Sequence, residues 1–247
     1  MVERFRIHSF DELGSTQTLA RDWVSRGQTT SGDVIFAKRQ TMGYGRRGRG
    51  WDMIEGNLSV TWIEDFFPER LSWIGYAVSL GLYDALKDIL PDGVAVTLKW
   101  PNDVLIEEGK ASGVLIEVCE NKLLIGLGVN LVAAPQADQR TAALGDFIAK
   151  PPQPETFLAS FLESYDRWFE TGNAQGFPGL RRDWLVHAHN INRPVTARLA
   201  DGRVLTGIFT DLDPSGALLL NTESGLEKVT TADIFITGTH DTKTRTG

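Results

Sequence analysis

Lys99-Trp100-Pro101-Asn102-Asp103 is the stretch on which the fold assignment depends. Val94 to Trp100 is rich in β-branched and apolar residues and predicts a strand, which Pro101 ends in an extended conformation. We expect this break to turn Asn102 and Asp103 out of the ladder, where an amide and a carboxylate can hold a magnesium ion and the phosphates that it neutralises. Taken alone, an Asn-Asp pair after proline is more often only a turn.

Strand-like and helix-like runs surround this motif on both sides. Strands are predicted at Val34 to Ala37, Leu58 to Ile63, Val104 to Ile106, Gly113 to Val118 and Leu123 to Leu131. Apolar residues at helical spacing predict helices over Thr16 to Arg26, Leu71 to Ile89, Phe157 to Phe169 and Leu180 to Ala188. The short breaks between the later strands predict hairpins. The fold class is therefore α+β, a mixed and largely antiparallel sheet with helices.

The last quarter of the chain differs in texture. Ala133 to Pro154 is rich in alanine and proline and predicts a wandering surface connection. From Pro194 onward, short β runs alternate with turn signals such as Asp201-Gly202 and Ser224-Gly225, which predict a small β-barrel. We therefore expect a large domain over residues 1–190, a β domain over 191–238 and a polar tail over 239–247.

Composition limits the functions that the chain can have. The net charge of -7 argues against a protein that grips nucleic acid over its whole surface, because neutralising phosphates requires clustered Lys and Arg. Cys119 is the only cysteine, which excludes an intramolecular disulfide and a cysteine-based metal site and fits a reducing cytoplasm. We expect no signal peptide and no membrane span.

The segment Gln40-Thr-Met-Gly-Tyr-Gly-Arg-Arg-Gly-Arg-Gly-Trp51 alternates glycine with guanidinium groups in an acidic protein. Glycines let backbone amides approach phosphate or carboxylate oxygens, and Arg46, Arg47 and Arg49 can add charge-assisted hydrogen bonds. The segment has no apolar periodicity, so we expect a mobile loop that takes an anionic ligand. A solvated basic loop without a ligand is the commoner reading of such a segment on its own.

Two further patterns follow the strand-ending motif. Lys110 comes seven residues after it, ahead of Gly113 and Glu117, and could project its ammonium group toward the same place. Gly126-Leu-Gly-Val-Asn130 puts small residues in an apolar strand, which suggests the close approach of a ligand or of another backbone. The dinucleotide-binding fingerprint and the Walker A sequence are both absent, so ATP would have to bind outside a P-loop.

Together, in this order and spacing, these segments resemble the catalytic domain of the biotin protein ligases. The resemblance covers about residues 8 to 131, and the C-terminal β unit fits the SH3-like appendix of that family. It implies a class II synthetase-like biotin/lipoate ligase catalytic domain. The family's N-terminal winged helix-turn-helix is missing, because the first catalytic helix begins by residue 16, so we expect the monofunctional form without repressor activity.

The resemblance also implies roles for individual residues. Lys110 and Arg46 would be catalytic, stabilising the charge that grows on the α-phosphate. Biotin would be bound by Ser15, Thr16, Gln17, Gln40, Tyr44, Gly45, Arg46, Lys110 and Gly113. ATP would be bound by Arg46, Arg47, Arg49, Trp51, Asn102, Lys110 and Asn130, with Asp103 near Mg2+.

Two positions depart from the family's usual pattern. The family usually has Arg where this chain has Tyr44, and Asn where it has Gln17. Tyr44 removes one cation from the loop, so the resemblance implies weaker retention of the adenylate. Gln17 changes reach by one methylene without changing the type of donor and acceptor.

The resemblance implies a biotin–[biotin carboxyl-carrier protein] ligase that converts ATP to AMP and pyrophosphate. It would form biotinyl-5'-AMP and transfer biotin to a lysine of the biotin carboxyl carrier domain of a carboxylase, with no nucleic acid or membrane partner. A lipoate or octanoate ligase on the same scaffold would need a longer apolar slot. A non-catalytic biotin-binding relative is the other rival, and Tyr44 is its best argument. A homodimer stays open.

Overall fold

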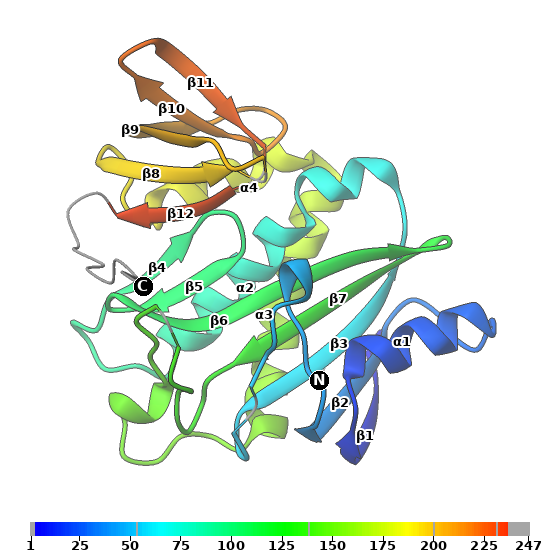
Figure 1. Ribbon diagram of the computed structural model, residues 1–247. Helices are drawn as coiled ribbons and strands as arrows, with labels where there is room; N and C mark the ends of the chain where they lie inside the picture. The colour runs from blue at the N-terminus through cyan, green and yellow to red at the C-terminus, as the bar shows by residue number, and fades with distance from the viewer. Residues whose placement is uncertain (1–2, 53, 138, 200, 231, 237–247) are drawn as a thin grey trace, which may run out of the picture.

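The computed structural model describes residues 3–236 except Met53, Asp138, Ala200 and Thr231. The predicted polar tail over 239–247 lies outside the described residues, as do residues 237 and 238. The described chain forms a seven-stranded sheet in the order β1-β2-β3-β7-β6-β5-β4 and a five-stranded sheet in the order β11-β10-β9-β8-β12 (Figure 1).

The large sheet is mixed and largely antiparallel, as the sequence predicts. Its strands are β1 Arg6–Leu13, β2 Asp33–Gln40, β3 Leu58–Asp65, β4 Val96–Lys99, β5 Asp103–Ile106, β6 Gly109–Cys119 and β7 Lys122–Val129. Only β1 and β2 pair in parallel. The sequence did not predict β1, because this edge strand is only partly buried and mixes charged with apolar residues.

Helices cover the two faces of this sheet unequally. They are α1 Thr16–Ser25, α2 Ile74–Lys87, α3 Pro154–Gln175 and α4 Phe177–Val186. The main core lies between the sheet and the pair α2 and α3, and it takes in Phe36, Trp62 and Ile125. A smaller core under α1 takes in Ile35 and Leu124, which neighbour these residues in the strands. Because successive strand residues point to opposite faces, α1 covers the face opposite to α2 and α3 (Figure 1).

Two expected elements differ from the structure. The helix predicted from Leu71 begins at Ile74, because residues 68–72 form a 3-10 turn ahead of it. The connection over 133–154 is not purely a surface loop, which corrects the prediction. Ala143 and Leu144 are fully buried, and the Ala142 amide donates to the Lys110 carbonyl at 3.0 Å. Alanine and leucine in this segment therefore wall one side of β6.

The small C-terminal unit is confirmed as an antiparallel sheet. Its strands are β8 Pro194–Leu199, β9 Val204–Leu212, β10 Leu218–Thr222, β11 Gly225–Val229 and β12 Ala232–Ile236. It docks on the large domain through the turn at Gly216, whose carbonyl accepts hydrogen bonds from the Tyr76 hydroxyl and, at 3.1 Å, from Trp100 Nε1. Trp100 of the Lys99-Trp100-Pro101-Asn102-Asp103 motif thus joins the two sheets.

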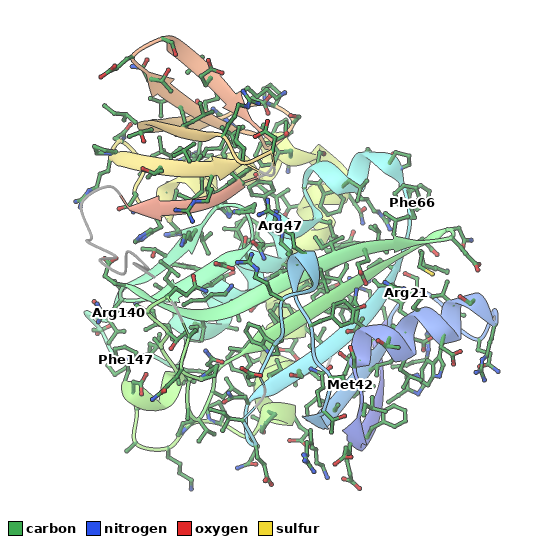
Figure 2. All side chains as sticks on the ribbon, viewed as in Figure 1. Arg21, Met42, Arg47, Phe66, Arg140 and Phe147 are labelled. Carbon is green, nitrogen blue, oxygen red and sulfur yellow. The ribbon has the colours of Figure 1, made fainter. Side chains whose placement is uncertain are left out.

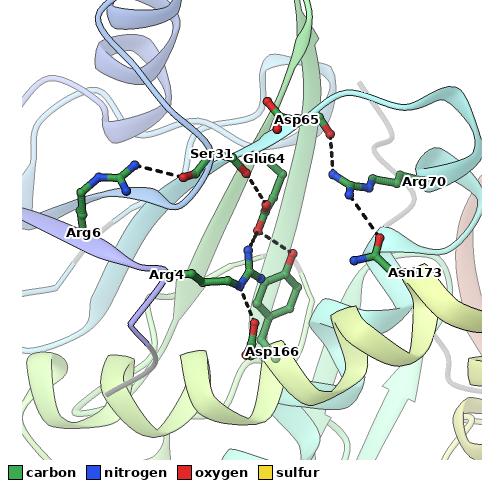
Figure 3. Close-up of polar contacts among 9 residues, drawn as sticks. Arg4, Arg6, Ser31, Glu64, Asp65, Arg70, Asp166 and Asn173 are labelled. Atoms are coloured by element: carbon green, nitrogen blue, oxygen red, sulfur yellow. Dashed lines mark hydrogen bonds and ion pairs between the residues drawn. The ribbon is translucent and has the colours of Figure 1, made fainter.

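The N-terminal end of the chain is tied to β3 and α3 by a partly buried polar network (Figure 3). Arg4 donates to Glu64 at 2.8 Å and also to Asp166. Ser31 and Tyr165 donate to the same Glu64 carboxylate, at 2.9 Å and 3.4 Å. Burial raises the pKa of Glu64, although the neighbouring Arg4 opposes that shift. The network fixes the edge of the sheet, and none of its members belongs to the motifs described above.

No helix in the described part of the chain is long and apolar enough to cross a membrane.

Candidate functional site

The start of α1 and the end of β2 are joined by hydrogen bonds among residues assigned to biotin. Ser15 caps α1, because its hydroxyl accepts from the Thr18 amide at 3.4 Å. Gln40 Oε1 accepts from the Thr16 amide at 2.7 Å and from the Thr16 hydroxyl at 3.1 Å. The Thr61 hydroxyl of β3 lies 2.8 Å from Thr16 Oγ1. A buried cluster of hydroxyl and amide groups therefore forms on the α1 face of the sheet.

Gln17 extends this cluster toward β6 and β7. Its side chain is 3% exposed, and its Oε1 accepts from the Thr61 hydroxyl at 3.0 Å. Its Nε2 donates to Glu117 Oε2 at 2.9 Å and to the Leu124 carbonyl at 3.3 Å. A Cβ on Gly126 would lie 2.8 Å from Gln17 Oε1, so this glycine makes room for the glutamine. Every polar atom of the Gln17 amide thus has a partner within the protein.

The Gly/Arg segment is a folded turn laid over the α1 face. Tyr44 and Gly50 form an isolated bridge, and the Gly45 amide donates to the Arg49 carbonyl at 2.7 Å. Arg47 is exposed at the tip with a left-handed backbone, at φ 59° (Figure 2). The Tyr44 hydroxyl donates to Glu117 Oε2 at 3.2 Å. Burial and the charge of the Glu117 carboxylate both raise the pKa of Tyr44, so its hydroxyl keeps its proton.

Trp51, at the end of this segment, packs on the two glycine-containing strands. A Cβ on Gly128 would lie 2.3 Å from the indole ring, and one on Gly113 would lie 3.3 Å from it. The glycines of β6 and β7 are therefore required for the ring to reach the sheet. This contact is the close approach that the small residues of the Gly126-Leu-Gly-Val-Asn130 segment predict.

Lys110 and Asp103 meet across the β5–β6 hairpin. Lys110 Nζ lies 2.7 Å from Asp103 Oδ1, and the two side chains are 20% and 14% exposed. Asp103 pairs with Lys99 and Gly113 in the sheet, so the expectation that Pro101 turns it out of the ladder is wrong. The turn is complete at residue 102, and the chain pairs again from the next residue.

The Lys-x-x-Gly spacing has a structural cause. Residues three apart in a regular strand face opposite sides of the sheet, but the pairing of β5 with β6 shifts register between Val104 and Leu105. The irregularity brings Lys110 and Gly113 to the same face, where a Cβ on Gly113 would lie 3.5 Å from Lys110 Nζ. Lys110 is thus a half-buried strand residue and not an exposed turn lysine.

Arg46 also meets the strand-ending motif. Its Nη1 donates to Asn102 Oδ1 at 3.0 Å, and Asn102 Nδ2 donates to the Val114 carbonyl at 2.8 Å. Asn102 therefore fixes the guanidinium relative to β6. Arg46 and Lys110, to which the family resemblance assigns catalytic roles, are held by adjacent residues of one motif. Arg47 and Arg49 are more exposed than Arg46.

Asn130 lies beneath this pair and not in the open. Only 2% of it is exposed, and its Nδ2 donates to the carbonyls of Lys110 at 3.4 Å and Ala142 at 3.1 Å. Its Oδ1 is buried without a hydrogen-bond partner among the described residues. Buried polar atoms without partners are rare in folded proteins, which is consistent with a ligand-binding site here.

A cleft of about 400 Å³ adjoins these groups, between the large domain and the C-terminal unit. Its walls include Arg46, Asn102 and Trp100 on one side and Ser215 and Gly216 on the other. A second cleft, near Trp73, is lined by none of the residues singled out from the sequence. Among the described residues, no group of three or more His, Cys, Asp or Glu side chains could hold a metal ion by itself.

Sequence reasoning assigned no role to three residues that belong to this constellation. Thr61 supplies a hydroxyl from β3, and Arg21 Nη2 of α1 donates to Glu117 Oε2 at 2.8 Å. Glu117 was part of the quoted pattern, so its spacing from Lys110 was a usable signal. Thr61 and Arg21 carry no local signal, because only the packing of α1 on the sheet brings them to the site.

Two family models match the chain. One described as the Biotin/lipoate A/B protein ligase family matches residues 10–131, and one described as the Biotin protein ligase C terminal domain matches residues 191–236. The first range holds every residue to which the family resemblance assigns a role in binding or catalysis. The second covers the five-stranded sheet.

Named relatives and solved structures agree with these models. The chain is 32% identical over 224 residues to the biotin–[acetyl-CoA-carboxylase] ligase of Paracoccus denitrificans, with 83% of this chain and 90% of the relative covered. It is 30% identical to the biotin–[acetyl-CoA-carboxylase] ligase of Mycobacterium tuberculosis, with 90% and 86% covered. The biotin protein ligase from Aquifex aeolicus, solved in complex with biotin and ATP, superposes with a TM-score of 0.83 at 26% identity, covering 93% of this chain and 97% of that one.

Proposed function

Because the chain belongs to the biotin protein ligase family, we propose that it condenses biotin with ATP to biotinyl-5'-AMP and transfers the biotinyl group to a lysine of a biotin carboxyl carrier domain. The observation that carries this proposal is the joint placement of Arg46 and Lys110 on Asn102 and Asp103, on the face that also holds Trp51. The names of the relatives point to a carboxylase as the acceptor.

In the first step, an oxygen of the biotin carboxylate attacks the α-phosphorus of ATP and pyrophosphate leaves. Negative charge grows on the phosphoryl oxygens in the transition state. We assign Arg46 and Lys110 to stabilise that charge, since cations positioned before the reaction lower the barrier more than they stabilise the ground state. No protein nucleophile is needed.

The other site residues are assigned to the parts of biotin and ATP that their side chains can bind. Ser15, Thr16 and Gln40 offer hydroxyl and amide groups suited to the ureido ring of biotin, and Trp51 offers a flat apolar surface suited to adenine. Gly45 in the loop and Gly113 in β6 let their backbones approach the ligand closely. Asn130 supports the Lys110 backbone. Arg47 and Arg49 supply further positive charge at the rim.

Magnesium fits this site only as an ion carried by the nucleotide. Asp103 provides one carboxylate and Asn102 one amide oxygen, and Mg2+ typically takes one or two protein carboxylates together with substrate phosphates. Bound there, the ion would neutralise phosphate charge. Lys110 makes an ion pair with Asp103, which compensates the charge of this carboxylate.

In the second step, the deprotonated amine of the acceptor lysine attacks the carbonyl carbon of the mixed anhydride. The amide bond forms, the acyl–phosphate bond breaks, and AMP leaves. This step requires the acceptor to be held within reach of the anhydride and kept from water, which is a matter of positioning. We propose that the two units, residues 1–190 and 191–238, hold the acceptor in this position. The acceptor would enter through the cleft between them.

The rival readings differ in what they require of the pocket. A lipoate or octanoate ligase would need a long apolar slot, whereas the described cluster at Ser15, Thr16, Gln40 and Thr61 is polar. A non-catalytic biotin-binding relative would not need Lys110 and Arg46 beside the strand-ending motif. We propose a cytoplasmic location, which the single cysteine of the chain fits, and no nucleic acid partner, which the acidic balance of the chain supports.

The test is incubation of the protein with ATP, magnesium, biotin and a biotin carboxyl carrier domain, followed by mass spectrometry of the carrier. We expect a gain of one biotinyl group that depends on ATP. Parallel reactions with lipoate and octanoate in place of biotin separate the rival substrates. A carrier that gains mass only with lipoate or octanoate would contradict the proposal, and so would a carrier that gains none with any acid.

A further inference from the structure

One carboxylate oxygen collects hydrogen bonds from three side chains at the edge of the candidate site. Glu117 Oε2 accepts from Gln17 Nε2 at 2.9 Å, from Arg21 Nη2 at 2.8 Å and from the Tyr44 hydroxyl at 3.2 Å. The donors come from α1 and from the Gly/Arg loop, and the acceptor comes from β6. We propose that Glu117 is a positioning residue that anchors the loop to α1 and thereby slows the escape of biotinyl-5'-AMP, an inference that rests on the proposed function.

The two departures from the family pattern, Gln17 and Tyr44, meet at this oxygen. Asparagine at position 17 would be shorter by one methylene, and Gln17 uses the extra length to cross Gly126 and reach Glu117. Tyr44 occupies the position where the family usually has a cation, and Arg21 supplies a guanidinium to the same carboxylate from the neighbouring helix. Arg21 thus places a guanidinium from α1 against the carboxylate that Tyr44 also contacts.

Charge makes this contact suited to anchoring. The ion pair with Glu117 raises the pKa of Arg21, and the raised pKa of Tyr44 keeps its hydroxyl a donor. Hydrogen bonds to a charged acceptor are stronger than those between neutral groups. The Glu117 side chain is 25% exposed, so solvent weakens the contact without removing it. Arg21 lies between α1 and the β6–β7 hairpin (Figure 2).

The loop is therefore held to the rest of the protein by two contacts, which respond differently when a ligand binds. Arg46 donates to Asn102, in the part of the site that the proposed function gives to phosphate, so a ligand would compete for that guanidinium. Tyr44 and Glu117 lie outside that exchange and can keep their contact in both states. Because the contact between Tyr44 and Glu117 has to break before this part of the loop can open, it slows opening and the escape of the adenylate.

The experiment compares Glu117→Gln with Glu120→Gln, which removes the same charge three residues along the same hairpin, at an exposed residue. In ligand-free protein, trypsin cleavage after Arg46, Arg47 and Arg49 is timed. In a second measurement, preformed biotinyl-5'-AMP is chased with excess unlabelled biotin and ATP, and its dissociation is followed. We expect both rates to rise about 3- to 10-fold in Glu117→Gln, corresponding to a hydrogen bond of modest net strength, and to stay unchanged in Glu120→Gln.

Tyr44→Phe removes only the hydroxyl and gives a second reading if Glu117→Gln does not fold. It should speed cleavage of the ligand-free loop in the same direction. Equal cleavage and equal adenylate dissociation in Glu117→Gln and Glu120→Gln would overturn the inference. If the wild-type protein forms no adenylate, the proposed function fails, but the cleavage comparison still decides whether Glu117 anchors the loop, because it needs no ligand.

Discussion

Lys110 and Asp103 form an ion pair at 2.7 Å on a face lined mainly by neutral groups. We predict that Lys110→Ala lowers pyrophosphate release with biotin and ATP by about 100-fold or more, because it removes a cation positioned for the transition state. The structure adds a cost that the sequence did not suggest, since Asp103 loses its partner. A destabilisation of about 1 kcal/mol or less is expected for such a partly exposed pair.

Lys122→Ala is the matched control for this prediction. Lys122 also pairs with an aspartate, Asp65, on the neighbouring strand, and its side chain is 15% exposed, close to the exposure of Lys110. It lies outside the candidate site. Thermal melts of both variants should show similar small losses, whereas only Lys110→Ala should lose pyrophosphate release. Equal rates in the two variants would exclude Lys110 from the chemistry.

The glycines of β7 show how one strand serves two parts of the site. A Cβ on Gly128 would come within 2.3 Å of the Trp51 indole. We predict that Gly128→Ala displaces the ring and raises the KM for ATP by about tenfold, the cost of roughly one apolar contact. Steady-state kinetics with ATP varied at saturating biotin measures this effect.

Gly126→Ala is its natural comparison, since it lies two residues away on the same face. There a Cβ would meet the Gln17 side chain at 2.8 Å and not Trp51. We expect the change to fall on the KM for biotin and on loop cleavage, with the KM for ATP little altered. The same ATP effect in both variants would mean that the indole does not mark the nucleotide side of the face.

We expect ligand binding to change the conformation of the Gly/Arg loop more than that of any other element. Its tip residues Arg47 and Arg49 are exposed, while Arg46 is held on Asn102. We predict that biotin with ATP slows trypsin cleavage after these arginines, because the adenylate supplies anionic partners for the loop. Gel analysis of timed digests with and without ligands provides the measurement. Unchanged cleavage would refute gating by this loop.

At the scale of the whole molecule, the two sheets are joined near two histidines. The segment around Ala188 pairs with Leu98 of β4, through amide-to-carbonyl bonds of 2.8 Å in both directions. Burial lowers the pKa of His187 and of His189 below the ordinary histidine value of 6.5, although two aspartates beside His187 and one glutamate beside His189 oppose the shift. Both histidines are therefore neutral in the folded protein at pH values where the unfolded chain already binds protons.

The sign of the resulting pH dependence follows. Below pH 6.5 the unfolded state binds more protons than the folded state, so the free energy of unfolding falls as the pH falls toward the lowered pKa values. We predict that the melting temperature drops between pH 7 and pH 5, and that His187→Gln with His189→Gln flattens this slope. Melting curves across that range test it. A slope of equal size in the double variant would assign the dependence to groups other than these two histidines.

Local sequence was enough to identify the chemistry and most of the elements. Charged and glycine residues at set spacings mark the Gly/Arg loop, the Lys99-Trp100-Pro101-Asn102-Asp103 motif and the Gly126-Leu-Gly-Val-Asn130 strand, and these spacings can be read directly from the sequence. Alternating apolar residues marked the central strands, and β1 was missed because an edge strand is only half buried.

Pairings across the chain depended on packing. Gln17 and Glu117 are 100 residues apart, and they meet only because α1 covers the face opposite to α2 and α3. The irregularity between β5 and β6, which turns Lys110 toward Gly113, arises from pairing with a neighbouring strand. No local pattern encodes which face a helix covers or where a ladder shifts register, since both depend on the total surface that folding buries.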